Sequence, residues 1–302
     1  MAINVHNLRV YNMIVGAGSS GGEGGGGGGG GYSVPIETNG LQLFLDAANT
    51  TSYSGTGNTW ADLSGNGNDF TGGASGGTST PTFVSDGDAS YFQFQESSST
   101  LFHADSLTPS DYGFGRTPDN VTISFWAVPN SLTSNVFNDA ENWFSFYYGF
   151  SKTVSGTTST GNNGETEFWQ MADTYGNRTQ NDLMRLNLFN AGKGNDPISG
   201  GTWYNVASDA GNWTNYTLVS EADSTSGLTF QLYRNGSATS YNETLSTTTS
   251  VTINSIGRFY LGGNATSTNY FWNGKLANFA LYNRALSASE VLSNYNALSS
   301  RF

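Results

Sequence analysis

The sequence predicts an all-β protein, an antiparallel β-sandwich or jelly roll with one short helix near its C-terminus. Of the 302 residues only 11% are charged and 40 are glycine, whereas about 25% charge is usual in globular domains. Ser, Thr, Asn and Gly take the place of the missing charge, and they favour turns and polar strand faces over helices. The aromatic content of 14% is too high for a disordered chain. These features predict a sandwich with an apolar core.

Short β-rich runs recur along the chain, each bounded by turn residues. In one of them Val121, Ile123 and Phe125 alternate toward a single face, as in a half-buried strand. Asn235 and Gly236 follow another run directly and predict a hairpin, because both residues tolerate positive φ. Such spacing is typical of an antiparallel sandwich. The predicted strands are 41–45, 91–95, 121–126, 216–220, 228–233, 258–261 and 276–282.

One helix is expected after residue 287. Ser287 and Glu290 form a capping box, in which each side chain satisfies an exposed backbone donor of the other residue. An apolar stripe that packs on the sandwich is then predicted at helical spacing, from Val291, Leu292, Tyr295 and Leu298.

The N-terminal residues 1–31 are predicted to form an extended arm that precedes the sandwich of residues 32–302. Residues 16–31 are almost pure glycine, and glycine loses the most conformational entropy when it becomes ordered. The arm is therefore expected either to be held in order by partner subunits of a large assembly or to act as an ordinary flexible linker.

The charge balance excludes several classes of partner. Eleven Lys and Arg against 23 Asp and Glu give a net charge of −12, and the basic residues are scattered singly. Binding to nucleic acid or to an anionic membrane needs clustered basic residues. The sequence contains no apolar run of about 18 residues, the length that a membrane-spanning helix needs. The absence of Cys excludes disulfides and thiolate metal sites.

The composition is of an extracellular type, but the N-terminus lacks the pattern of a secretory signal. A virion component, made in the cytoplasm and released by lysis, has both properties. A secreted protein whose signal has been removed is the alternative.

Several motifs resemble those of one family. Residues 60–70 fit the pattern W-x-D-x-S-G-x-G-N, residues 81–94 a strand preceded by a D-G turn, 121–126 a strand ending in Trp, and 232–236 the hairpin L-Y-x-N-G. Residues 272–291 are similar to a closing signature, F-x-G-x-[IL]-x-x-x-x-[IL]-Y-x-R-x-L-S-x-x-E-[IV]. In order and spacing, residues 40–299 resemble the concanavalin A-like, laminin-G-like jelly-roll domains. The resemblance implies that fold. It also implies a tailed-bacteriophage virion, because glycine-rich arms are common beside such domains there.

Aromatic side chains are the candidates for carbohydrate binding, because their faces pack on the C–H surfaces of sugars. In a strand over 143–150, Phe144 and Phe146 share one face while Trp143 and Tyr147 take the other. Trp169 and Trp213 complete the candidate set of Trp143, Tyr147, Trp169 and Trp213. Burial in the core or in a subunit contact is the alternative for these rings.

Calcium is the more plausible ion for a site in this chain, since it binds carboxylate and carbonyl oxygens of loops. One oxygen-rich loop carries Asp62, Asn66, Asn68 and Asp69, and a second carries Asp86 and Asp88. The resemblance implies calcium near such turns. Asp and Asn also occupy turns for local hydrogen bonding alone, which is the alternative.

Catalysis is not expected. A Ser-His-Asp arrangement needs a histidine, and of the two in the chain His6 lies in the arm, while His103 is expected in a loop or at a rim. Strict alternation places Glu165, Glu167 and Trp169 on one strand face, with the acids roughly 6–7 Å apart. The E-x-D-x-x-E strand of the jelly-roll hydrolases is absent.

The sequence therefore predicts a non-enzymatic phage surface protein, such as a decoration protein, head fibre or tail-associated adhesin, located on the virion. Residues 1–31 would bind other virion proteins and the chain would form a homo-oligomer. The sandwich would either bind cell-surface glycans or have a purely structural role. A bacterial surface lectin or adhesin and a glycan-degrading enzyme are the alternatives.

Overall fold

A computed structural model describes one compact unit within Val34–Phe302. The described residues are 34–73, 78–105, 116–117, 120–129, 141–147, 151–154, 157–160, 167–173, 183–187, 204–205, 207–223, 227–245, 251–253, 258–263 and 271–302. For β7, β9–β14 and β18 the description is of the backbone and its register. The predicted arm of residues 1–31 lies outside the described residues and stays a prediction.

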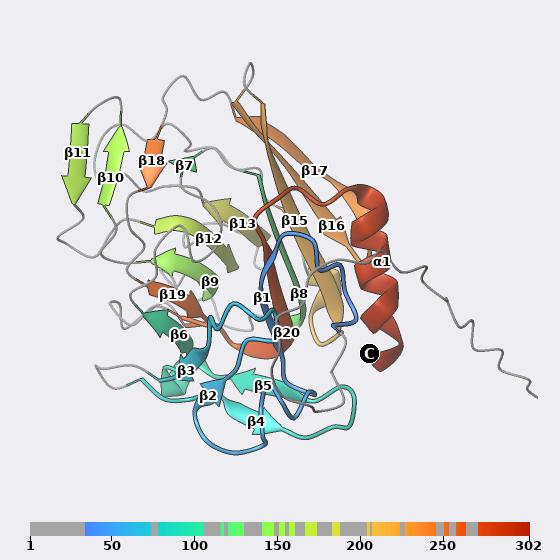
Figure 1. The fold of residues 1–302 in the computed structure, drawn as a ribbon. Coiled ribbons are helices and arrows are strands. Elements are labelled where there is room, and N and C mark those ends of the chain that lie inside the picture. The colour runs from blue at the N-terminus through green and yellow to red at the C-terminus, as the bar shows by residue number, and fades with distance from the viewer. Residues whose placement is uncertain are drawn as a thin grey trace, which may run out of the picture. The chain divides into compact units, whose positions relative to one another are not determined.

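The strands form two large antiparallel sheets (Figure 1). The first, called the helix-side sheet below, has the order β17-β16-β15-β8-β20-β5-β4, and β1 also pairs with β20. Its strands are β1 (Leu41–Asp46), β4 (Thr82–Val84), β5 (Tyr91–Phe94), β8 (Val121–Pro129), β15 (Thr214–Asp223), β16 (Gly227–Arg234), β17 (Ser237–Leu245) and β20 (Gly274–Tyr282).

The second, called the opposite sheet, has the order β14-β13-β12-β9-β19-β6-β3-β2. Its strands are β2 (Thr59–Trp60), β3 (Phe70–Gly72), β6 (Phe102–Asp105), β9 (Glu141–Tyr147), β12 (Glu167–Asp173), β13 (Leu183–Asn187), β14 (Tyr204–Asn205) and β19 (Arg258–Leu261). A small third sheet contains β7 (Arg116–Thr117), β10 (Ser151–Val154), β11 (Thr157–Thr160) and β18 (Val251–Ile253). The 3-10 turns are η1 (Glu96–Ser98), η3 (Ala207–Asp209) and η4 (Ser299–Arg301).

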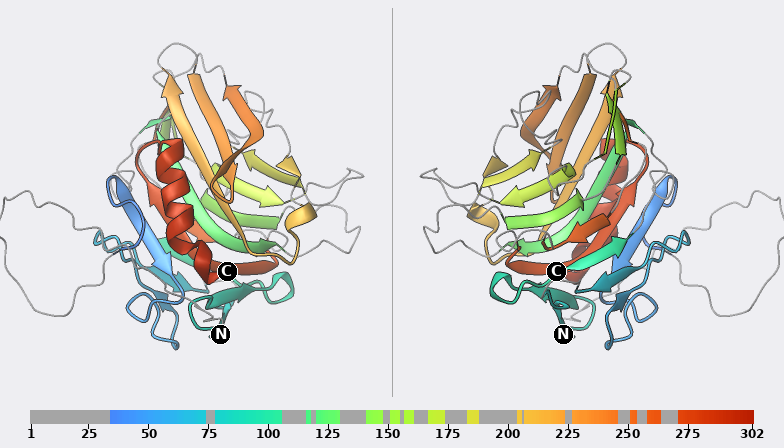
Figure 2. Two further views of the ribbon diagram at one scale, coloured as in Figure 1. Left: turned by 90° about the vertical axis from the view of Figure 1, so that its right-hand side faces the viewer. Right: turned by 90° about the vertical axis from the view of Figure 1, so that its left-hand side faces the viewer.

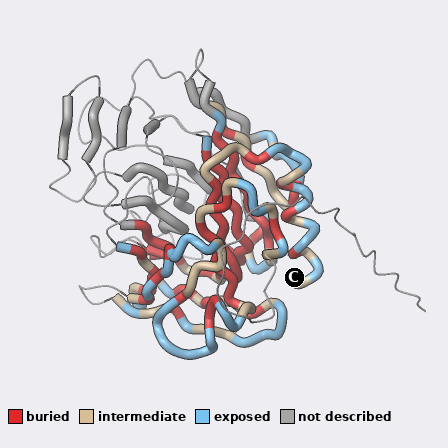
Figure 3. The backbone as a smooth tube through the Cα atoms, viewed as in Figure 1, coloured by how far each residue is buried: buried red, intermediate tan, exposed pale blue. Residues whose placement is uncertain are grey.

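The core between the two large sheets is rich in aromatic rings. Phe92 packs on Trp60 and Phe102 with ring centroids 4.6 and 4.7 Å apart, and Phe259 packs on Phe279 at 5.5 Å. Figure 3 shows the buried residues concentrated along the central strands. The predicted sandwich and its predicted strands are therefore confirmed.

Strand β8 is buried on both of its faces. Val121, Ile123 and Phe125 lie in the core as their alternation predicts, but Thr122 and Trp126 on the other face are also buried. The cause is the helix α1 (Ala288–Leu298), which lies across the outer face of the helix-side sheet (Figure 2).

The capping box at the start of α1 is confirmed, since Ser287 Oγ accepts from Glu290 N at 3.3 Å and Ser287 N donates to Glu290 Oε2 at 2.8 Å. The predicted apolar stripe is wrong at Leu292, because 45% of the surface of this residue is exposed. Asn294 is buried in its stead, and its side chain donates to the Tyr282 hydroxyl at 3.0 Å. The helices in the described part of the chain are too short or too polar to cross a membrane.

The hairpin predicted at 235–236 is also confirmed. Asn235 has φ +50° and Gly236 has φ +74°, and these two residues join β16 to β17. Both conformations lie in the left-handed region that a two-residue hairpin turn requires.

Candidate functional site

The register of β9 assigns its residues to the two faces of the opposite sheet. Phe144 pairs with Leu261 and Phe146 with Phe259, and both partners are fully buried in the core. Because successive residues of a strand alternate between faces, Tyr147 takes the outer face. The sequence prediction that Phe144 and Phe146 share a face opposite to Tyr147 matches this register.

Two rows of polar and aromatic residues cross that outer face. Neighbouring strands lie about 4.8 Å apart, so each row places its members side by side. The first row is Glu167–Tyr147–Arg258–Asp105 on β12, β9, β19 and β6. The second row is Asn187–Gln170–Ser145–Tyr260–His103 on β13, β12, β9, β19 and β6. By register, the two rows place acidic, basic, amide, hydroxyl and aromatic residues on one face of the sheet.

A β-bulge separates Trp169 from this face. Glu167 pairs with Tyr147 and Trp169 pairs with Phe146, so Phe168 between them has no partner on β9. The extra residue reverses the alternation, and Trp169 takes the core-side register of Phe146. The expectation that Glu167 and Trp169 share a face is therefore wrong, and Glu165 lies outside the described residues.

Trp143 stands at a second bulge. Phe144 pairs with Met171 and Asn142 with Ala172, which leaves Trp143 as the extra residue on β9. Trp143 and Tyr147 both lie on β9.

Trp213 lies on the far side of the sandwich from β9. It is half-buried just before β15, with its ring centroid 4.8 Å from Phe302 and 5.6 Å from Tyr91. These rings belong to the apolar cluster beneath α1. The four predicted carbohydrate-binding residues therefore do not form one site.

His103 lies within strand β6, so the expectation of a loop or rim position is wrong. Its Nε2 is 3.3 Å from Asp105 Oδ2, and its buried Nδ1 has no hydrogen-bond partner among the described residues. The neighbouring Tyr260 is fully buried in a small cluster with Leu101 and Phe271. This end of the outer face is consequently covered.

The loop from Asp62 to Asp69 is held by internal hydrogen bonds. Asp62 Oδ1 accepts from the amides of Phe44 and Ser64 at 2.9 and 2.8 Å, and Oδ2 accepts from Ser64 Oγ at 2.7 Å and Asn68 N at 3.1 Å. Four donors use the acceptor sites of a carboxylate. Asp62 therefore does not fit a calcium ligand.

The other three predicted ligands of this loop, Asn66, Asn68 and Asp69, also form hydrogen bonds within the protein. The amides of Asn66 and Asn68 donate to the Gln42 carbonyl at 3.2 and 2.9 Å, and Asp69 Oδ1 accepts from Asp62 N at 2.8 Å. Asp86 and Asp88 flank an exposed turn around Gly87. Among the residues that the structure describes, no three His, Cys, Asp or Glu side chains gather at one point. Calcium at the 86–88 turn stays a prediction.

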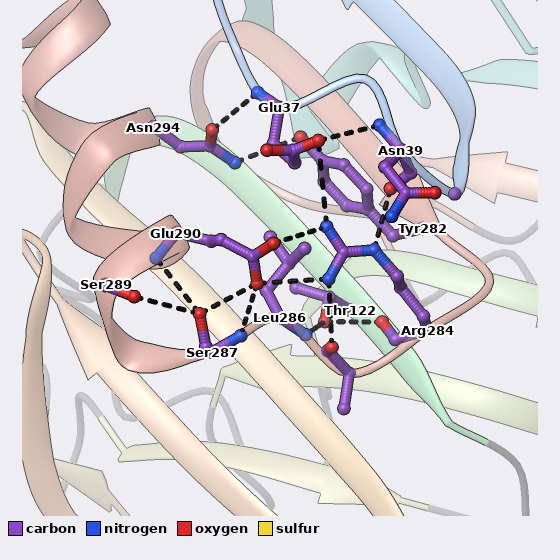
Figure 4. A network of polar contacts seen from close by, with 12 residues as sticks. Glu37, Asn39, Thr122, Tyr282, Arg284, Leu286, Ser287, Ser289, Glu290 and Asn294 are labelled. Carbon is purple, nitrogen blue, oxygen red and sulfur yellow. Dashed lines mark hydrogen bonds and ion pairs between the residues drawn. The ribbon is translucent and has the colours of Figure 1, made fainter.

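A polar network fixes the start of the described chain to α1 (Figure 4). Glu37 N donates to Asn294 Oδ1 at 2.8 Å, and Arg284 Nε donates to the Asn39 carbonyl at 2.8 Å. Arg284 Nη2 also pairs with Glu290 Oε1 at 2.7 Å. These hydrogen bonds, first from Arg284 and then from Ser287, lower the pKa of Glu290 to about 2. Residues 37–39 are thereby held on the helix side of the sandwich.

Comparison with known proteins agrees with this architecture. A family model described as "Concanavalin A-like lectin/glucanases superfamily" matches residues 86–292. A search of curated proteins finds no match.

Among solved structures, Trypanosoma rangeli sialidase in complex with sialic acid is similar with a TM-score of 0.52 and 15% identity, over 88% of this chain and 34% of that one. The receptor binding domain of botulinum neurotoxin D gives 0.54 and 12%, over 86% and 53%. The binding domain of Paraclostridial Mosquitocidal Protein 1 gives 0.52 and 15%, over 86% and 52%. The chain thus spans about a third to a half of each protein, and at these identities the likeness concerns the fold.

Proposed function

Because the chain belongs to the concanavalin A-like lectin/glucanase superfamily, we propose that it is a carbohydrate-binding domain without catalytic activity. The observation that carries this proposal is the placement of Tyr147 on the outer face of the opposite sheet. In register it lies between Glu167 and Arg258, beside the row that contains Gln170 and Ser145.

The residue types in these rows suit a sugar. An aromatic ring covers the C–H face of a pyranose, while amide, carboxylate and guanidinium groups exchange hydrogen bonds with its hydroxyls. Trp143, the extra residue of the bulge on the same strand, is a second aromatic candidate. The uncharged second row favours neutral hydroxyl-rich ligands.

Within the first row, the separation of the two acids favours binding over hydrolysis. Glu167 and Asp105 stand at opposite ends of the first row, three strand spacings apart, which is about 14 Å. Glycosidases hold their two carboxyl groups about 5 to 9.5 Å apart. A glycan-degrading enzyme is therefore the less favoured function, and hydrolysis that is lost in Glu167→Gln would support it.

We place this domain on the surface of a phage virion, as a decoration protein, head fibre or tail-associated adhesin held by residues 1–31. The glycine-rich residues 16–31, which precede a domain of this family, support this placement. A bacterial surface lectin or adhesin is the alternative setting.

Oligomer formation is proposed to run through the arm. The edge strands β2 and β4 have two and three residues, and the register of β16 with β17 shifts between Gln231 and Tyr233. Short or bulged edges oppose pairing between sheets of different molecules. The arm is therefore the better contact between subunits.

Binding is tested on a glycan array with the wild type, Tyr147→Ala and Gln170→Ala. Asn296→Ala on the exposed side of α1 is the matched control. We expect the first two variants to lose retention of neutral glycans by about tenfold and the control to bind as the wild type does. Equal retention by all four proteins would remove the proposed site.

The setting is tested by electron cryomicroscopy of the native particle, with the chain traced from residue 1 to 32. An arm ordered against capsid subunits supports a decoration protein or head fibre, and an arm embedded in the tail supports an adhesin. Absence of the chain from every particle would leave the surface lectin.

A further inference from the structure

Lys275 differs from the other basic side chains that the structure describes. Arg234 pairs with Asp209, Arg284 with Glu290, and Arg301 with Asp46. Within the described part of the chain, no carboxylate lies within salt-bridge distance of Lys275. Its Nζ lies over the ring of Tyr91, 4.8 Å from the centroid. In a protein with a net charge of −12, a cation without a carboxylate partner is the exception.

The surroundings of Lys275 are aromatic and only half-buried. Tyr91 meets Trp213 edge-on with ring centroids 5.6 Å apart, and Trp213 lies 4.8 Å from Phe302. Lys275 and Trp213 thus contact the same tyrosine. A partly exposed lysine ammonium over an aromatic ring attracts an anion.

A neutral polar group lies beside them. Gln93 pairs with Lys275 in the register of β5 and β20. Gln93 Nε2 donates to the carbonyls of Phe94 and Gly274 at 3.0 and 2.9 Å, which leaves Oε1 as an acceptor for a ligand hydroxyl.

We propose that Lys275, Tyr91 and Trp213 form a second carbohydrate-contact surface, and that its ligand is a sugar with a carboxylate, such as a uronate. The ammonium of Lys275 binds the carboxylate, the aromatic rings cover the C–H face of the sugar, and Gln93 accepts from a hydroxyl. This surface, called the Lys275 surface below, lies on the helix-side sheet, so it is separate from the Tyr147 face. Loss of one proposed site would therefore leave the other unaffected.

The probe is a short oligouronate, because the net negative charge of the chain opposes the approach of a long polyanion. Trigalacturonic acid and its methyl ester have the same sugar framework and differ in the carboxylate charge. Isothermal titration calorimetry with both compounds compares the wild type with Lys275→Gln and Lys275→Arg. Asn296→Ala is again the control.

We expect Lys275→Gln to weaken binding of the acid about tenfold and Lys275→Arg to change it less than about threefold, since a charged hydrogen bond is lost only in the former. The ester should bind both forms equally. The proposal is overturned if Lys275→Gln binds the acid as tightly as the wild type, if the wild type does not distinguish acid from ester, or if it binds neither.

Two further variants separate the surfaces. Trp213→Ala should weaken binding of the acid, and its near-ultraviolet circular dichroism reports whether Phe302 still packs. If that packing is lost, Lys275→Gln decides the test alone. Tyr147→Ala should retain the acid while it loses neutral glycans. Loss of the acid in Tyr147→Ala would move the ligand to the Tyr147 face and overturn the Lys275 surface, whereas loss of neutral glycans alone supports both sites.

Discussion

Arg301 and Asp46 form a two-pronged ion pair, with Nη1–Oδ2 and Nη2–Oδ1 distances of 3.0 and 2.8 Å. Arg301 belongs to the turn that follows α1, and Asp46 is the last residue of β1. Both side chains are largely buried, at 13% and 5% exposure. The pair therefore ties the C-terminal turn to the helix-side sheet.

Removal of one partner should be costly. An uncompensated charge in such a position destabilises a protein by about 3 kcal/mol. We expect Arg301→Gln to lower the free energy of unfolding in urea by that amount. Lys275→Gln, which breaks no ion pair, should change it by less than about 0.5 kcal/mol. Equal effects of the two substitutions would contradict the structural role of the pair.

The capping box should make stability depend on acid pH. Arg284 and Ser287 lower the pKa of Glu290 to about 2 from an ordinary 4.5, so the folded state holds the carboxylate ionised more tightly than the unfolded state does. This stabilisation is complete above about pH 4.5 and is lost as the pH falls toward 2.

Thermal unfolding between pH 2 and 7 tests that dependence with Glu290→Gln. At pH 7 the variant should lose about 1 kcal/mol, as for other lost caps. The difference from the wild type should shrink as the pH falls. A difference that is constant over this range would show that Glu290 acts through packing and not through its charge.

Two glycines form a matched pair for backbone tests. Gly262 has φ +83° and a Cβ there would collide with the ring of Phe94, whereas Gly211 has φ +78° with open space around it. Alanine at 211 should cost about 1 kcal/mol from conformation alone. Alanine at 262 should cost more than about 3 kcal/mol, since it adds overpacking of the core. Chemical denaturation of Gly211→Ala and Gly262→Ala measures both, and equal losses would refute the steric contribution.

Removal of metal tests the calcium prediction. Asp62 already accepts four hydrogen bonds, so we expect no calcium at the 62–69 loop. EDTA should therefore change the midpoint of thermal unfolding by less than about 2 °C. A larger loss that calcium reverses, and that disappears in Asp86→Asn, would locate the ion at the 86–88 turn. The same loss in Asp62→Asn alone would contradict our assignment of the Asp62 oxygens.

Along β9 and β12, strand alternation predicts the face of some residues and fails for others. Alternation places Phe144, Phe146 and Tyr147 on the faces that the register gives them. It fails at Trp169, because the extra residue Phe168 is paired with nothing on β9. A bulge depends on the neighbouring strand, so a single strand's pattern does not reveal it.

Features decided within a few residues could be predicted from the sequence alone. The turn at Asn235 and Gly236 follows from their tolerance of positive φ, the box of Ser287 and Glu290 from hydrogen bonds across one helical turn, and the strands from alternation. The tertiary structure decided the rest. It buried Asn294 and exposed Leu292, because the Tyr282 hydroxyl offers Asn294 a partner. It also placed Trp213 on the opposite side of the sandwich from Tyr147, because contacts between distant segments depend on how the whole sandwich packs.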